Sequence, residues 1–250
     1  MLSRSSRYES EVPVRGLARP FGGDNPLTGI VSVFNADSRE LILKMPTDDQ
    51  GEFFFHCRVG LRIFLKFERE GWWWMGYRTT HSRIFEVPEE GINHPNKLHN
   101  ITFQVPSNVI FSLFSKAMGI AEDPSKAQIA VTVTPPGMTL DNIPQGEPGV
   151  EVTIEPNPGV KARYLGIFSF FNKTNPLSSH PLTSDDGGVI FPNVVPGTYK
   201  ISARKGRHKV SIMIWAPPGG FVNASPTKGL VIPQEMQKPE SADDPALCFN

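Results

Sequence analysis

A nine-residue pattern that occurs twice constrains the fold of this chain more than any other feature of its sequence. Residues 47–55 read TDDQGEFFF and residues 183–191 read TSDDGGVIF, so both copies fit T-x-D-x-G-x-[FV]-x-F. Aspartate and glycine favour a tight turn, the threonine side chain can bond back to it, and alternating apolar residues begin a strand with one buried face. The two copies therefore predict the start of an equivalent β-hairpin in each half of the chain.

Strand-like alternation continues after the first copy. In EFFFHCR, residues 52–58, every second side chain is apolar and inward, which leaves Phe54 on the outer face. In LRIFLKF, residues 61–67, the same period leaves Phe64 on the outer face. We expect these two segments to pair as a hairpin that turns at Gly60 and feeds a third strand.

One segment, residues 106–119, has helical rather than strand periodicity. Ser107 is suited to cap its first turn and Gly119 is suited to end it. The apolar residues that recur at helical spacing are Val109, Ile110, Leu113, Phe114, Ala117 and Met118. Strand patterns then return in AQIAVTVTP, residues 127–135, and in several later segments. This order predicts an all-β protein with one short connecting helix.

The second copy of the repeat runs on into a longer motif. Residues 187–203 fit G-x-[VF]-x-F-x-N-V-x-P-G-T-Y-x-[IV]-x-A. This run resembles the carboxypeptidase-regulatory-like group of transthyretin-type (prealbumin-like) β-sandwiches, well over residues 183–215 and more weakly over residues 28–80. The resemblance implies two transthyretin-like, Ig-like Greek-key β-sandwich domains. It also implies a function as a non-catalytic module, because members of this group are usually attached to enzymes or surface proteins and some are related to starch-binding-like sandwiches.

These patterns divide the chain into five predicted parts. The parts are an N-terminal arm at 1–26, a first β-sandwich at 27–106, a helix and connecting segment at 107–148, a second β-sandwich at 149–233 and a flexible tail at 234–250. The arm and the tail are assigned from their polar, Pro-containing and non-periodic sequences.

Composition limits the classes of partner. Lysine plus arginine and aspartate plus glutamate each number 25, so the formal net charge is zero and no global field favours nucleic acid or an anionic membrane. No run of about eighteen apolar residues occurs, so a membrane span is not expected. The two cysteines, Cys57 and Cys248, do not indicate a disulfide framework. Without a visible signal peptide we expect a cytoplasmic protein if Met1 is the native start, and an extracytoplasmic one if a signal has been removed.

A run of aromatic residues gives the first candidate site. In a strand, Trp72 and Trp74 lie on one face, whereas Trp73 and Tyr77 lie on the other. One row must belong to the core, and the other joins outward phenylalanines on a surface that a single sandwich leaves exposed. Either the helix, the second domain or another copy packs there, or the surface stacks against a sugar or an aromatic ligand. The candidate ligand-binding residues are Trp73, Tyr77, Arg78, His81, Phe54 and Phe64.

Three histidines in one irregular segment give the second candidate site. His81, His94 and His99, with Glu86, could bind zinc or iron, since imidazole and carboxylate groups suit these metals. The spacing matches no recognised ligand pattern, and solvated or hydrogen-bonded histidines are the alternative. The main interpretation therefore includes no cofactor.

Together these features favour a non-catalytic binding or assembly module. Its aromatic face would hold a partner subunit, another copy of the chain, or a carbohydrate-like or aromatic small molecule. The alternative is a metal-assisted hydrolase or lyase with the histidine-rich site between the two sandwiches, where a bound metal would activate water and a glutamate would act as base.

Overall fold

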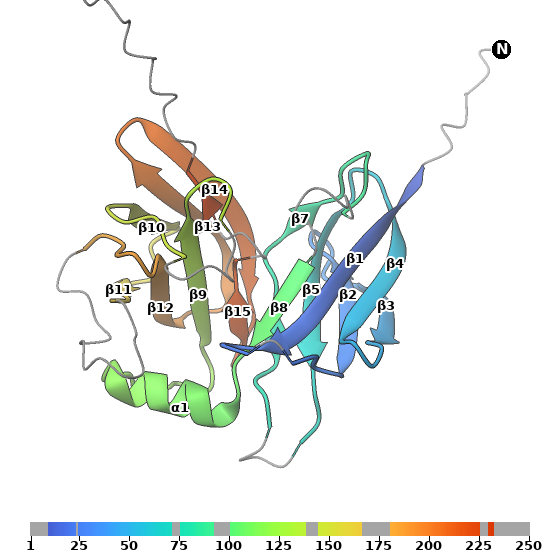
Figure 1. Cartoon of the computed structure of the whole chain (residues 1–250), viewed down its shortest axis with the longest axis horizontal. Helices are drawn as coiled ribbons and strands as arrows, with labels where there is room; N and C mark the ends of the chain where they lie inside the picture. The colour runs from blue at the N-terminus through green and yellow to red at the C-terminus, as the bar shows by residue number, and fades with distance from the viewer. Residues whose placement is uncertain are drawn as a thin grey trace, which may run out of the picture.

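The computed structural model describes residues 10–23, 25–71, 76–92, 101–138, 145–166, 181–225 and 230–232. Within these residues the chain forms sixteen strands and one helix, arranged as two β-sandwiches that stand side by side (Figure 1). Each sandwich has its own hydrophobic core. The prediction of an all-β protein with one short helix is confirmed.

The first sandwich packs a three-stranded sheet against a larger one. The small sheet has the order β4 (Glu52–Arg58), β1 (Glu11–Pro20) and β8 (Ile101–Val105). The facing strands are β6 (Thr80–His81), β5 (Arg62–Glu68), β2 (Ile30–Asn35) and β3 (Leu41–Pro46), with β7 (Phe85–Glu86) also paired to β5. Large fully buried side chains such as Phe67, Phe103 and Leu65 fill the space between the sheets.

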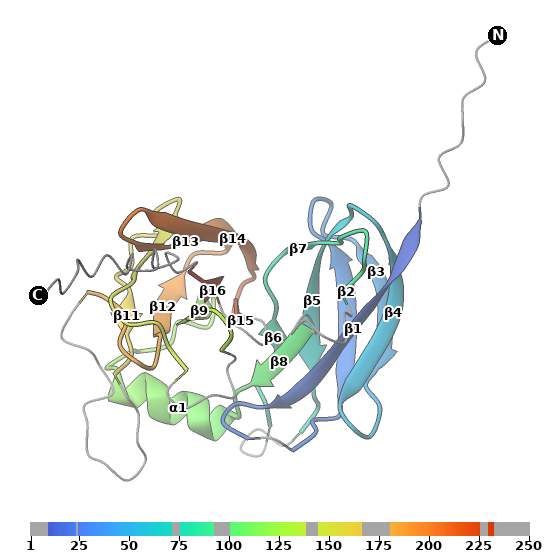
Figure 2. The ribbon, with the colours of Figure 1, turned by 45° about the horizontal axis from the view of Figure 1, so that its top comes forward.

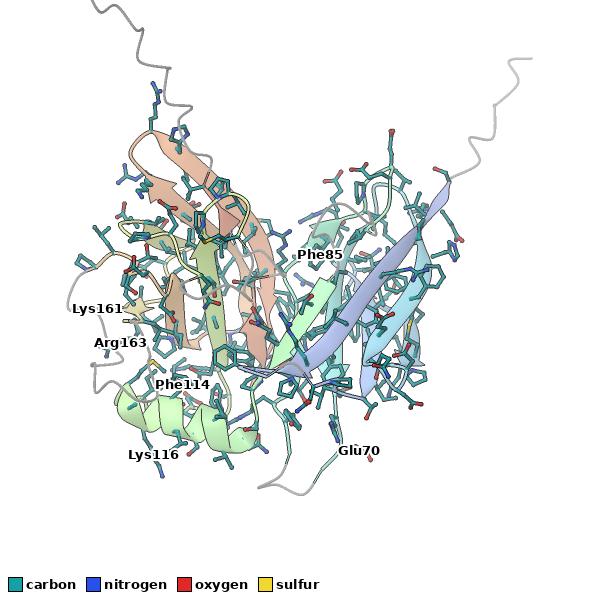
Figure 3. All side chains as sticks on the ribbon, in the orientation of Figure 1. Glu70, Phe85, Phe114, Lys116, Lys161 and Arg163 are labelled. Carbon is teal, nitrogen blue, oxygen red and sulfur yellow. The ribbon has the colours of Figure 1, made fainter. Side chains whose placement is uncertain are left out.

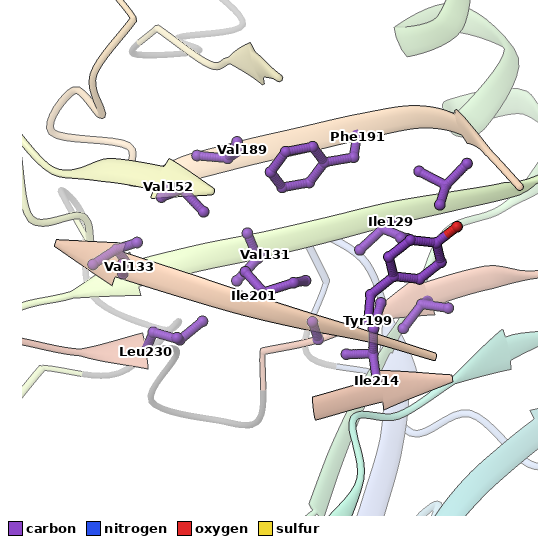
Figure 4. Close-up of a cluster of buried hydrophobic side chains, with 14 of the residues drawn as sticks. Ile129, Val131, Val133, Val152, Val189, Phe191, Tyr199, Ile201, Ile214 and Leu230 are labelled. Atoms are coloured by element: carbon purple, nitrogen blue, oxygen red, sulfur yellow. The ribbon is translucent and has the colours of Figure 1, made fainter. Parts of the chain in front are cut away.

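The second sandwich also packs a three-stranded sheet against a larger one. Its small sheet has the order β10 (Glu151–Glu155), β13 (Gly197–Lys205) and β14 (His208–Ala216). The facing strands are β11 (Arg163–Tyr164), β12 (Gly188–Val194), β9 (Ala127–Thr134), β15 (Phe221–Asn223) and β16 (Leu230–Val231). Phe191, Ile129 and Ile201 meet between the two layers (Figure 4).

The threonine of the repeat makes the same hydrogen bonds in both halves. Thr47 donates its N–H to the Gly29 carbonyl at 2.9 Å and accepts the Gly29 N–H on Oγ1 at 3.0 Å. Thr183 donates its N–H to the Val150 carbonyl at 2.9 Å and accepts the Val150 N–H on Oγ1 at 2.8 Å. The threonine thus bonds to the residue before β2 in the first sandwich and to the residue before β10 in the second, and not back to its own turn as the sequence pattern suggested.

The glycine of the repeat is equivalent as well. Gly51 has φ 73° and accepts the Ala18 N–H at 2.8 Å, and Gly187 has φ 72° and accepts the Val133 N–H at 3.0 Å. Strand β1 in the first sandwich therefore corresponds to β9 in the second. Both strands also pair in parallel with a final strand, β8 in one case and β15 with β16 in the other. The chain is a tandem repeat in structure as well as in sequence.

The predicted hairpins after each repeat copy are wrong. β4 pairs with β1, whereas β5 pairs with β2, β6 and β7, so the turn at Gly60 carries the chain from one sheet to the other. In the second half β12 pairs with β9 and β11, and β13 pairs with β10 and β14. Alternation identifies the buried face of a strand but not its partner, because two facing sheets both offer an apolar inner surface.

Two predicted boundaries also need correction. Residues 11–20, predicted to belong to an N-terminal arm, form β1, the central strand of its sheet. The apolar pattern of this strand is weak because its inward positions include Gly16 and Ala18, which are small. Residues 127–134, predicted to belong to the connecting segment, form β9, which contributes Ile129 and Val131 to the second core.

Helix α1 (Asn108–Ala117) lies where the sequence predicted it (Figure 3). Ser107 caps it by accepting the Ile110 N–H at 3.2 Å, and Gly119 follows with φ 63°. The predicted apolar stripe matches the buried face only in part, because Met118 is buried but Val109 and Leu113 are exposed. Phe111, which is not in the stripe, is buried against Phe221 of β15. No helix among the described residues is long and apolar enough to span a membrane.

Candidate functional site at the junction of the two sandwiches

The two sandwiches share one continuous sheet. β15 of the second sandwich pairs in parallel with β6 of the first, with Phe221 opposite Thr80 and Val222 opposite His81. This contact joins the larger sheets into one ten-stranded sheet (Figure 2). Eight of its strands follow the path β11-β12-β9-β15-β6-β5-β2-β3, and the other two, β16 and β7, pair with β9 and β5. The junction therefore uses backbone hydrogen bonds as well as side-chain packing, which limits hinge motion between the sandwiches.

A second backbone contact crosses the junction at β14. Ile84 donates its N–H to the Met213 carbonyl at 2.8 Å, and Arg83 forms an antiparallel bridge with Ile214. The Arg83 guanidinium lies 4.9 Å from the centre of the Phe85 ring, which is labelled between the sandwiches in Figure 3. Burial lowers the pKa of Arg83 to about 10, so the side chain still carries its charge at neutral pH.

Arg39 clamps the β2–β3 turn onto the second sandwich. The Asn35 side chain holds this turn by accepting the Asp37 N–H at 2.8 Å, and Arg39 has φ 66°, which is unusual for a residue other than glycine. The Arg39 guanidinium donates to Thr198 Oγ1 at 2.7 Å and lies 4.0 Å from the centre of the Trp215 ring. Hydrogen bonding and cation–π attraction thus act on one side chain.

Phe64, a predicted ligand-binding residue, lies inside the junction. It points away from the first core, as the alternation of β5 required, yet only 4% of its surface is exposed. Its ring stacks on Phe34 with centroids 5.1 Å apart and lies 6.5 Å from His81, which is opposite Val222 of the second sandwich. For Phe64 the position favours packing between the sandwiches over ligand binding.

His81 is a buried, neutral histidine at the same place. Burial is the main cause that lowers the pKa of His81 to about 4, and the nearby charge of Lys66 lowers it further. A hydrogen bond with the Phe221 backbone has the opposite, smaller effect on this pKa. No hydrogen-bond partner of His81 Nδ1 is present among the described residues. Protonation of this buried imidazole is therefore expected to oppose the β6–β15 contact, in which His81 lies opposite Val222.

Phe54 lies on a different surface from Phe64. It is 45% exposed on the outer face of β4, with the Arg15 guanidinium 4.8 Å above its ring and the His56 ring 5.0 Å away. The prediction that Phe54 and Phe64 share one surface is wrong, because β4 and β5 belong to opposite sheets. The error follows directly from the hairpin assumed around Gly60.

Tyr77 and Arg78 lie at the start of helix α1. Tyr77 forms an antiparallel bridge with Ser107, and Arg78 donates to both carboxylate oxygens of Glu122 at 2.7 and 2.5 Å. The Arg78 guanidinium also lies 4.1 Å from the centre of the Phe111 ring. Arg78 therefore fixes the helix and the segment after it. Trp73 lies outside the described residues.

The predicted metal ligands are not brought together where the structure describes them. His81 is buried opposite Lys66, whereas Glu86 is exposed opposite Arg62, four residues away on β5. His94 and His99 lie outside the described residues, and no group of three potential ligands occurs among the rest. The zinc or iron site stays a prediction, which metal analysis of the parent protein and a His94→Ala/His99→Ala variant would test.

Sequence reasoning missed the residues that build the junction. Arg39 lies in a polar connection between two strands, and nothing in its neighbourhood indicated a long-range contact. Trp215 ends an alternating segment on its outer face, which was the one available signal. Thr198 belongs to the motif of residues 187–203, but that motif did not indicate a hydrogen bond with Arg39.

Replacing Arg39 by alanine is expected to loosen the junction. Loss of the Thr198 hydrogen bond and the Trp215 contact should cost about 1–2 kcal/mol. The amide of Ile84, which bonds across the junction, should exchange its hydrogen about tenfold faster, whereas the amide of Ala18 inside the first sandwich should not change. Unchanged exchange at Ile84 would show that the clamp contributes nothing.

Comparisons with known proteins give no family assignment. No family model matches the chain, and no curated protein matches it.

Three solved structures illustrate the structural similarities. The Bacillus anthracis TIE protein is 14% identical with a TM-score of 0.31, over 88% of this chain and 34% of that one, so the chain spans about a third of its length. The shaft pilin SpaA of Lactobacillus rhamnosus GG is 10% identical with a TM-score of 0.29, over 90% and 99%. BcpA, the major pilin subunit of Bacillus cereus, is 13% identical with a TM-score of 0.28, over 90% and 70%. These TM-scores are low, and the β-sandwich architecture rests on the strand pairing described above.

Proposed function

We propose that this chain is a non-catalytic binding and assembly module. In this proposal the two sandwiches act as one rigid unit, and the first presents an aromatic surface to a partner subunit or a carbohydrate-like ligand. The observation that carries the proposal is the ten-stranded sheet that continues through both sandwiches. The family resemblance of residues 183–215 is part of the same proposal, since it implies a transthyretin-like, carboxypeptidase-regulatory-like binding module.

Rigidity has a functional consequence for such a module. The β6–β15 pairing, the Ile84–Met213 hydrogen bond and the Arg39 clamp fix the orientation of the two sandwiches by three independent contacts. A pre-oriented surface loses little conformational freedom when a partner binds, so more of the contact energy becomes affinity. The junction residues support the binding surface and need not touch the ligand themselves.

The surface around Phe54 is the best-described part of the proposed binding face. Phe54 is half exposed, and neighbouring Arg15 and His56 hold its ring in place from two sides. A fixed aromatic ring beside a cation suits stacking on the apolar face of a sugar or on an aromatic ligand. The proposal also includes Trp73, Tyr77 and Arg78 as ligand-binding residues, with Trp73→Ala as the corresponding test. Tyr77 and Arg78 lie beside helix α1 and not on the face of β4 that carries Phe54.

The proposal is tested by titrating the full chain with maltohexaose and following its amide NMR signals. We expect shifts at Phe54, Arg15 and His56 that disappear in Phe54→Ala, while the unfolding free energy of this variant changes by no more than about 0.5 kcal/mol. Val195→Ala, which trims an exposed side chain of the second sandwich, is the control and should retain the shifts. Absence of shifts on this face in the parent would remove carbohydrate from the proposal.

A further inference from the structure

Arg83 is a largely buried cation at the junction of the two sandwiches. It forms a bridge with Ile214 of β14, and its guanidinium lies 4.9 Å from the centre of the Phe85 ring, which Figure 3 labels. No aspartate or glutamate among the described residues forms an ion pair with this guanidinium. Taking a charge out of water costs free energy, which an opposite charge and hydrogen bonds normally offset.

The hydrogen bonds of the Arg83 guanidinium show the same deficit. Its Nε atom is sealed from solvent and has no hydrogen-bond partner within the described part of the chain. Its two Nη atoms make no hydrogen bond to a described residue either, and they are not among the atoms that are sealed from solvent. A group from solution can therefore reach the Nη atoms, and buried donors without a partner are rare enough in native proteins to need an explanation.

Two other arginines of the first sandwich have the partners that Arg83 lacks. Arg62 forms an ion pair with Asp37 at 2.7 Å, and Arg78 donates to both carboxylate oxygens of Glu122 at 2.7 and 2.5 Å. Burial is the cause of the lowered pKa of Arg83, and no acid among the residues that the structure describes counteracts it. Of these three arginines, Arg83 is the one whose charge is left uncompensated.

We infer that the guanidinium of Arg83 binds an oxyanion, the carboxylate or phosphate group of a small ligand, at the junction of the two sandwiches. A guanidinium carries five N–H donors in a planar fork, which matches two oxygens of such a group. The Phe85 ring attracts the cation but offers no lone pair to these donors, so they stay available. Because the side chain is largely buried, a small ligand fits this place better than a broad protein surface.

An oxyanion at Arg83 acts on the contact between the sandwiches. The next residue, Ile84, donates its N–H to the Met213 carbonyl across the junction at 2.8 Å. A ligand that binds the folded chain and not the unfolded chain stabilises the fold by mass action. The oxyanion therefore strengthens the junction and slows hydrogen exchange of the Ile84 amide. This site is separate from the proposed binding face at Phe54 and does not depend on it.

Titration of the full chain with inorganic phosphate, and separately with acetate, tests the inference at constant pH and ionic strength with chloride as the balancing anion. We expect a saturable shift of the Ile84 amide NMR signal with a dissociation constant on the order of 1 mM for at least one of the two. The anion that binds more tightly identifies the ligand as a phosphate or a carboxylate. At ten times the dissociation constant, the equilibrium constant for unfolding should fall about elevenfold.

Three variants separate binding at Arg83 from a general effect of salt. Arg83→Gln should abolish the saturable shift, and Arg83→Lys, which keeps the charge but not the fork, should weaken binding about tenfold. Arg62→Gln is the matched control and should bind like the parent, because it removes an arginine that is already paired.

The titration of the parent protein covers the case in which Arg83→Gln fails to fold. A guanidinium that is only hydrated gives no saturable shift with either anion, and that result overturns the inference. An equal response in parent and folded Arg83→Gln overturns it as well. Neither result affects the maltohexaose test at Phe54, so the proposed function is judged separately.

Discussion

Replacing Gly187 by alanine is expected to lower the unfolding free energy of the second sandwich by about 3–5 kcal/mol. Gly187 has φ 72°, a conformation that costs other residues energy, and a Cβ atom there would lie 2.2 Å from the Val133 carbonyl oxygen. Because that carbonyl belongs to the buried strand β9, it cannot move aside without disturbing the core. Chemical denaturation of the parent and the variant measures the effect.

The tandem repeat supplies a matched pair and matched controls for this prediction. Gly51→Ala should have a similar effect in the first sandwich, since φ is 73° and a Cβ would lie 2.6 Å from the Ala18 carbonyl oxygen. Gly137→Ala and Gly60→Ala share a positive φ but meet no atom within 4 Å, so they should cost only about 1–2 kcal/mol of backbone strain. Equal losses in all four variants would show that the close approach is unimportant.

Acidification is expected to destabilise the protein through His81. The folded-state pKa is about 4 and the ordinary value is 6.5, so between these values the unfolded chain binds a proton that the folded chain excludes. The contribution is fully present above pH 6.5 and is lost as the pH falls toward 4. With 2.5 pH units between the two values, the loss is about 3 kcal/mol.

The His81 prediction is measured as a difference between proteins. The unfolding free energy should fall less between pH 7 and pH 4 in His81→Gln than in the parent, since carboxylates titrate equally in both. His56→Gln, on the exposed face of β4, should keep the pH dependence of the parent. If the parent and His81→Gln lose stability equally on acidification, the histidine at the junction is not the group responsible.

Much of the local structure could be predicted because it depends on local chemistry. The Asp–Gly turn held by the Asp48 side chain, the Ser107 cap and the inward residues of β4 all follow from interactions within a few residues. The same is true of the outward position of Phe64 on β5. In each case side-chain chemistry and the period of the backbone suffice to determine the result.

The candidate site could be predicted only in part, because its residues depend on contacts between distant segments. The six predicted ligand-binding residues do not form one surface, since Phe54 lies on an outer sheet, Phe64 and His81 lie in the junction, and Tyr77 and Arg78 lie beside the helix. The helix shows the same limit, because its buried face was set by Phe221, more than a hundred residues later.

The sequence by itself determined that this protein is a twofold repeat of β-sandwiches with equivalent turns, because repeat positions, turn residues and apolar alternation report on short-range constraints. Only the tertiary structure decided which strands pair, where each sandwich begins and how the sandwiches join. The physical reason is that any apolar strand face can pack on any other, so the choice is made by the packing of the whole chain. Arg39 on Trp215 and β6 on β15 are contacts of that kind.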